Sequence, residues 1–125
     1  MFDIDRFAAA CRTALTELGS DPIREVVRRA VSEPSDIIAA LGEQTGAFAG
    51  ILVRAPDLTI LNVVWGTRQW TLPHNHRHRA IIGMYGGGED NISTGAVCPT
   101  MRRGGWRRRA RPRFVTVTLR YWVAI

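Results

Sequence analysis

Three histidines fall within five residues of this 125-residue chain, at His74, His76 and His78, and the chain has no other histidine. In extended backbone, residues two apart point to the same face of a strand, so these imidazoles could converge on one side. Neutral imidazole nitrogens are ligands for Fe(II), Ni and Zn, so the spacing indicates a metal site. Pro73 favours extended backbone at Leu72, directly before the histidines. A solvated polar turn is the alternative that this spacing leaves open.

Three arginines flank or interrupt the histidines, at Arg68, Arg77 and Arg79. The guanidinium fork matches the two oxygens of a carboxylate, so each arginine is a candidate contact for the carboxylate of a substrate. A solvated arginine without a ligand is the alternative for all three.

The sequence around the histidines has the form of a known motif. Residues 65–76 read WGTRQWTLPHNH, and residues 81–91 read IIGMYGGGEDN. Together they resemble the first motif of the cupin superfamily, and more narrowly that of the thiol dioxygenases that act on cysteine or mercaptopropionate. In that group a strand with an H-x-H pair, as in His74-Asn75-His76, is followed by a "Y-x-G-x-E-x-N" turn, which is matched here by Tyr85, Gly87, Glu89 and Asn91. The resemblance implies Fe(II) held by His74 and His76, with O2 and a small thiol as substrates and a sulfinate as product.

The chain also departs from the cupin pattern. General cupins place a glutamate ligand four or five residues after the second histidine, where this chain has Ala80 and Ile81. That absence fits the dioxygenase branch, which uses three histidines and no carboxylate. The third histidine should come from a later strand, yet none follows His78, whose position is not a ligand in the family. We therefore expect weak Fe(II) binding by His74 and His76 and impaired activity.

The pattern of apolar residues predicts helices first and strands afterwards. A spacing of three or four residues predicts helices within residues 1–42, with Phe7, Cys11, Val27 and others inward. Short segments rich in β-branched residues predict strands at residues 47–54, 58–65, 69–73 and 79–85. The expected fold is mainly β: a partial cupin (double-stranded β-helix, jelly-roll) barrel in residues 43–93, preceded by the N-terminal helical segment 1–42.

Residues 94–125 form an atypical, arginine-rich C-terminal segment. From residue 91 onward the chain has eight arginines and no acidic residue, whereas residues 1–90 have nine arginines and eleven acids. All 17 basic residues are arginine. Out-of-frame translation of a GC-rich gene produces such composition, so one hypothesis is a frameshift or truncation after about residue 93.

The alternative hypothesis treats this segment as genuine. Residues 114–123 then alternate as a strand. Residues 102–113 would form a basic loop with Trp106 interleaved, suited to contact with phosphate and a nucleic-acid base. A cupin that binds a small molecule without catalysis is a third interpretation.

Composition sets broader limits. With 46% hydrophobic and 22% charged residues, the chain has the composition of one globular domain. No apolar run approaches the ~18 residues that a membrane span needs, and the acidic start MFDIDRF does not resemble a secretory signal. Two cysteines, Cys11 and Cys98, suit a reducing compartment. We therefore expect a cytoplasmic protein without a membrane partner, which self-associates through exposed barrel edges; nucleic acid is the less favoured partner.

Overall fold

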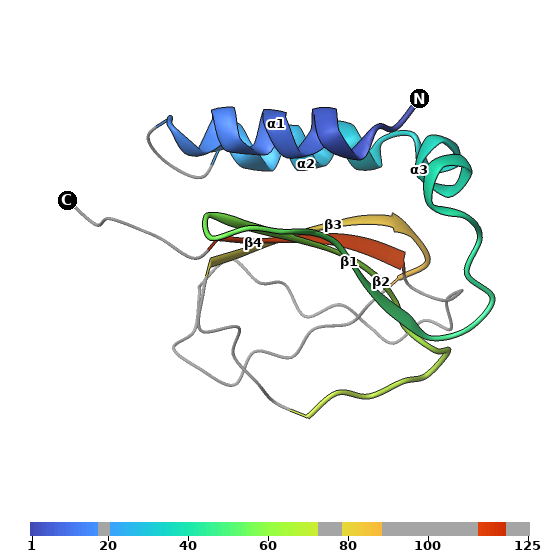
Figure 1. The fold of residues 1–125 in the computed structure, drawn as a ribbon. Coiled ribbons are helices and arrows are strands. Elements are labelled where there is room, and N and C mark those ends of the chain that lie inside the picture. The colour runs from blue at the N-terminus through green and yellow to red at the C-terminus, as the bar shows by residue number, and fades with distance from the viewer. Residues whose placement is uncertain (18–20, 73–78, 89–112, 120–125) are drawn as a thin grey trace.

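The computed structural model describes residues 1–17, 21–72, 79–88 and 113–119. The described elements are three helices and four strands (Figure 1): α1 (Ile4–Leu15), α2 (Asp21–Val31), α3 (Pro34–Leu41), β1 (Phe48–Arg54), β2 (Leu58–Val64), β3 (Arg79–Gly86) and β4 (Arg113–Leu119). The three helices lie where the apolar periodicity predicted helices.

Local sequence accounts for several ends of these elements. Asp3 precedes α1, and its Oδ1 accepts a hydrogen bond of 2.8 Å from the backbone N–H of Arg6, which satisfies a donor that the first turn leaves free. Pro34 opens α3, where its fixed φ is compatible with a first turn. Gly42 ends α3 with a φ of 79°, a left-handed conformation that favours glycine.

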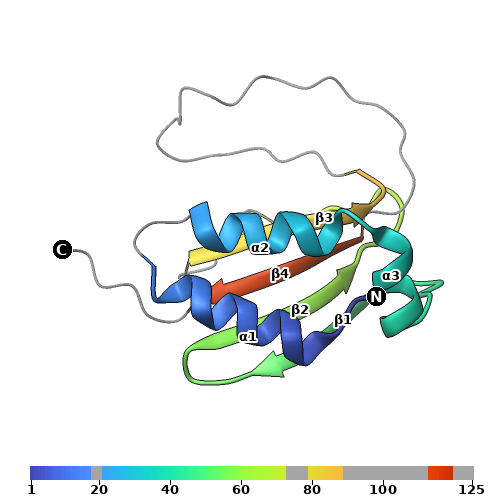
Figure 2. The same cartoon turned by 90° about the horizontal axis from the view of Figure 1, so that it is seen from above.

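Within the described residues, the strands form one antiparallel sheet in the order β1-β2-β4-β3. Strands β1 and β2 form a hairpin in which the Ala55 N–H donates to the Leu58 carbonyl at 2.8 Å. Helices α1 and α2 lie side by side on one face of the sheet (Figures 1 and 2). The described residues therefore build a helical layer on a sheet whose edge strands are β1 and β3.

Strand β4, which belongs to the arginine-rich C-terminal segment, lies between β2 and β3 in the described sheet. Its register places Val115 opposite Asn62 of β2 and Gly83 of β3, and Val117 opposite Ile60 and Ile81. The alternation predicted for residues 114–123 is therefore in phase with both neighbouring strands as far as Leu119, and residues 120–123 lie outside the described part. The frameshift hypothesis and the hypothesis of a genuine segment both stay predictions.

One predicted strand is absent from the sheet. Residues 69–72 of the predicted segment 69–73 form no strand, and Pro73 lies outside the described residues. A turn precedes them, in which the Gln69 N–H donates to the Gly66 carbonyl at 3.2 Å and the Gln69 side chain accepts from the Gly66 N–H at 2.8 Å. Trp70 and Leu72 are exposed, so their alternation does not serve burial on a sheet.

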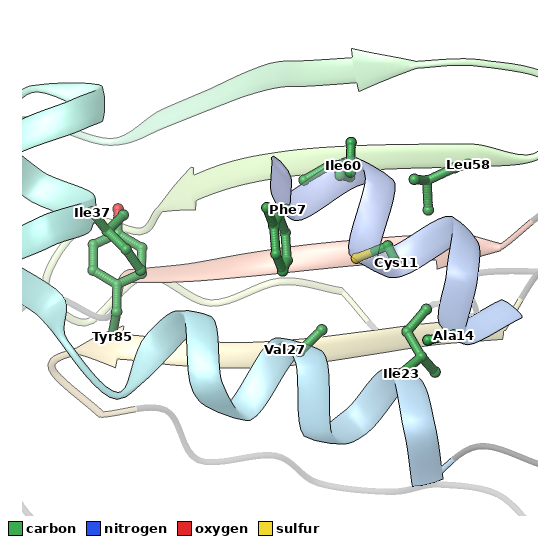
Figure 3. Packing of buried hydrophobic residues seen from close by; sticks show 10 residues of the cluster. Phe7, Cys11, Ala14, Ile23, Val27, Ile37, Leu58, Ile60 and Tyr85 are labelled. Carbon is green, nitrogen blue, oxygen red and sulfur yellow. The ribbon is translucent and has the colours of Figure 1, made fainter. Parts of the chain in front are cut away.

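The core lies between the helices and the sheet (Figure 3). Its fully enclosed members come from α1, α2, α3 and β2, and include Cys11, Ile23, Ile37, Leu58 and Ile60. One buried polar pair joins the two strands that flank β4: the Tyr85 hydroxyl donates to Asn62 Oδ1 at 2.8 Å. Because this pair satisfies the Asn62 side chain, the core accommodates a buried amide.

The other face of the sheet is also apolar. Gly83 faces α2, and its neighbours Ile82 and Met84 therefore point to the opposite face, where they are 45% and 37% exposed. Ile51 of β1, paired with Leu61, is 51% exposed. A cupin barrel would cover such a face with a second sheet. The partial barrel stays a prediction.

Candidate functional site

Of the residues predicted to form the site, the structure describes Arg68 and Arg79. His74, His76 and Arg77 lie in the segment 73–78, outside the described residues. Arg68 is exposed in the turn after β2, with a positive φ of 60°. Arg79 is the first residue of β3 and is half-buried. Among the described residues, Arg79 is therefore the predicted site residue that lines a hollow of the molecule.

That hollow is a groove of about 670 Å³ between α2 and β3, called here the α2–β3 groove. Its walls are Arg24, Val27, Arg28 and Val31 of α2, and residues 79–84 of β3. The two valines and Ile81 make an apolar floor, and the arginines contribute positive charge. Six consecutive residues of β3 line the groove, so it follows the strand over this length.

Gly83 sets the distance between the two walls. A Cβ atom at this position would lie 2.5 Å from Val27 Cγ1 and 2.8 Å from Val31 Cγ1. No ordinary contact is that short, so only glycine lets α2 approach β3 so closely. The residue type at position 83 thus positions the helix that carries Arg24 and Arg28.

The three arginines of the α2–β3 groove differ in their partners. Arg28 donates from Nε and Nη2 to the two carboxylate oxygens of Glu25, at 2.7 and 2.8 Å. For Arg24 and Arg79, the described part of the chain provides no acidic partner. The positive charge available to an anionic ligand is therefore greatest at Arg24 and Arg79.

Glu25 orders the surface beside the groove. It also accepts from Arg29 Nε at 2.7 Å, so one carboxylate holds two arginines of α2. The hydrogen bonds from Arg28 and Arg29 lower the pKa of Glu25 to about 2. The carboxylate is charged at neutral pH and fixes the position of Arg28 at the groove wall.

Two other chemistry-bearing features have structural roles. Cys11 is enclosed in the core, and desolvation raises the pKa of its thiol to about 11, against the smaller opposite effect of Arg12. It therefore exists as an unreactive thiol near neutral pH. A second hollow of about 380 Å³ lies between α1 and α2, where Ala10, Ala14 and Val26 contribute small apolar side chains.

Two features are absent from the described residues: a metal-binding cluster and a membrane-spanning helix. They contain no cluster of three histidine, cysteine or acidic side chains able to hold a metal ion. No helix among residues 1–17 and 21–72 is long and apolar enough to cross a membrane.

Sequence reasoning missed Arg24 and Arg28. A usable signal was present: both precede by three residues the inward-facing valines Val27 and Val31, one helical turn apart. The other half of the groove depends on β3 being an edge strand. That follows from the insertion of β4 between β2 and β3, a long-range pairing that the local pattern does not specify.

No family model, no curated protein and no solved structure matches the chain.

Proposed function

We propose that the chain is a metal-dependent, cupin-like protein related to the thiol dioxygenases, which holds Fe(II) through His74 and His76. The proposal is carried by the order of residues around β3. His74 and His76 precede the first residue of β3, Arg79, and Tyr85 and Gly87 of the resembled turn come at its end. Gly87 has a φ of 73°, a conformation that favours the glycine of this motif.

The alternation of β3 supplies a prediction for the histidines. Gly83 faces α2, so odd-numbered positions face the helices and even-numbered ones face away. If this alternation continued to residue 74, His74 and His76 would share the face of Ile82 and Met84. Arg77 and Arg79 would then be on the opposite face from the metal, which leaves Arg68 as the candidate contact for a substrate carboxylate.

The histidines of residues 74–78 fit the binding of a metal ion better than they fit the complete thiol dioxygenase reaction. Two imidazoles two residues apart can hold a divalent ion, and His78 adds a third nitrogen to the same segment. The third histidine of the resembled family, from a later strand, has no counterpart in this sequence. Bound Fe(II) would supply open positions for a thiolate and O2. We expect weak iron binding and little oxidation, and assign no catalytic step to the chain's own residues.

Iron binding to the purified protein without O2, measured by calorimetry, tests the proposal. We expect one Fe(II) per chain, with His74→Ala and His76→Ala each weakening binding at least about tenfold. Arg102→Ala, in the basic segment, is the matched control and should leave iron binding unchanged. Equal iron binding by the His74→Ala/His76→Ala double variant would overturn the proposal.

Oxygen consumption by the iron-loaded protein with cysteine or 3-mercaptopropionate then distinguishes a dioxygenase from the second candidate function, a non-catalytic binding protein. The missing third histidine favours a non-catalytic, small-molecule-binding cupin, which would bind iron and consume no O2 above background. Retention on a phosphate resin that falls with salt and with Arg102→Ala, without iron binding, would instead support the nucleic-acid alternative.

A further inference from the structure

We propose that the α2–β3 groove binds an extended acidic peptide, which adds a strand to the edge of β3 that no other described strand occupies. Three observations carry this proposal: the regularity of the β3 edge, the helix that runs beside it, and the arginines at one end of the groove. None of them depends on the metal site.

The β3 edge has the geometry that strand addition needs. Residues 79–84 pair one for one with residues 119–114 of β4, without a register shift, so this stretch is a regular strand. The shift comes only afterwards, between Met84 and Gly86. Within the described sheet β3 has β4 as a neighbour on one side only, and every second residue of an edge strand directs its N–H and C=O outward. Six residues provide an edge about 20 Å long.

Helix α2 forms a wall along that edge. Figure 2, which looks from above, shows α2 lying over β3, and the colours show that the two elements run in the same direction. Val27 and Val31 approach Gly83 closely, which closes the floor of the groove. A peptide at this edge would therefore bury its helix-facing side chains against α2 while its backbone pairs with β3.

The charges select an acidic peptide. Arg24 lies near the start of α2, and Arg79 is the first residue of β3, so both belong to the same end of the groove. The rise of an α-helix places Arg24 and Arg28 about 6 Å apart along the axis. Alternate residues of an extended chain repeat at about 6.6 Å. Carboxylates at alternate positions of a peptide would therefore match the arginines of this wall.

The face of β3 that points away from α2 determines which residues should lie between the carboxylates of the peptide. Ile82 and Met84 are partly exposed on the face away from α2 and also line the groove. Side chains between the carboxylates would point to that face and contact these two residues. The preferred ligand is thus an extended peptide in which acidic and apolar residues alternate.

Fluorescence anisotropy with the labelled peptide EVEVEVE tests the proposal on the full chain. We expect saturable binding, at least about tenfold weaker for the Arg24→Ala/Arg79→Ala double variant, because each arginine supplies a charge-assisted hydrogen bond. Matched controls are Arg29→Ala, which changes an arginine of α2 outside the groove, and Arg54→Ala, on the other edge strand. Both should stay within about twofold of the parent. Far-UV circular dichroism confirms that each variant is folded.

Peptides with N-methylated backbones distinguish binding by strand addition from binding by charge attraction alone. Two versions of EVEVEVE, N-methylated at odd or at even positions, keep every side chain. Only every second N–H points to a partner strand, so one version should lose binding and the other retain it. Equal binding of both versions, or of KVKVKVK, would overturn the proposal. Sedimentation gives the oligomeric state of the chain. If the chain is a dimer and EVEVEVE does not bind it, a second copy occupies the β3 edge, and this result would also overturn the proposal.

Discussion

The two edges of the sheet differ in ways that predict different behaviour. Strand β1 has an extra residue, Leu52, where its register with β2 shifts between Ile51 and Val53. Such a bulge bends an edge strand and interrupts its outward hydrogen-bonding groups. Strand β3 is regular over residues 79–84 and has α2 along its side. Regular backbone, a neighbouring helix and unpaired arginines therefore coincide at the β3 edge and not at the β1 edge of the described sheet.

The largest expected effect comes from substituting one glycine in each edge strand, Gly83 in β3 and Gly50 in β1. A Cβ at Gly83 would meet Val27 and Val31 of α2, and one at Gly50 of β1 would lie 2.5 Å from the ring of Phe48. The valines belong to a packed helix, whereas Phe48 is 40% exposed and can rotate away. We expect Gly83→Ala to lower the free energy of unfolding by about 2–3 kcal/mol, and Gly50→Ala by under about 1 kcal/mol.

Urea denaturation measures both changes. Gly46→Ala is the control, because a Cβ there meets open space. Equal losses for Gly83→Ala and Gly50→Ala would show that α2 does not constrain the β3 edge more than Phe48 constrains β1.

A smaller effect is expected from the polar pair that ties β3 to β2 across β4. Tyr85→Phe removes the hydroxyl that donates to Asn62 Oδ1, and Asn62 is 1% exposed. A buried acceptor left without its donor costs about 1–2 kcal/mol, which thermal or urea unfolding would detect. A double-mutant cycle with Asn62→Ala separates the pair from the ring's other contacts. A coupling free energy near zero would contradict the pairing.

The smallest expected effect is the pH dependence contributed by Glu25. Its pKa is lowered from 4.5 to about 2 by Arg28 and Arg29, so the folded state binds fewer protons than the unfolded state in this range. The stabilisation is therefore fully present above about pH 4.5 and is lost as the pH falls toward 2. The carboxylate is solvent-exposed, so we expect a small change.

Comparing urea midpoints of the parent and Glu25→Gln between pH 5 and 2 tests this assignment. The variant should show the shallower pH dependence. The same variant frees Arg28 at the groove and should tighten binding of EVEVEVE. Weaker peptide binding would indicate that Glu25 is needed to position Arg28.

The sequence-based prediction succeeded where local periodicity determines structure. Residues such as Cys11, Ile23 and Val27 repeat at helical spacing and are buried as predicted. It failed at residues 69–72, where alternating apolar side chains are exposed after the Gly66–Gln69 turn. The α2–β3 groove as a whole could not be predicted from the sequence. Both the close approach of α2 to Gly83 and the edge position of β3 depend on contacts between residues that are far apart in the chain. The metal interpretation of His74 and His76 stays a prediction.

The most direct test of the difference between the edges is amide hydrogen exchange by NMR, with and without EVEVEVE. We predict that outward-facing amides within residues 79–84 gain protection, while residues 48–54 of β1 do not change. Protection at β1, or at neither edge despite saturating peptide, would contradict the account.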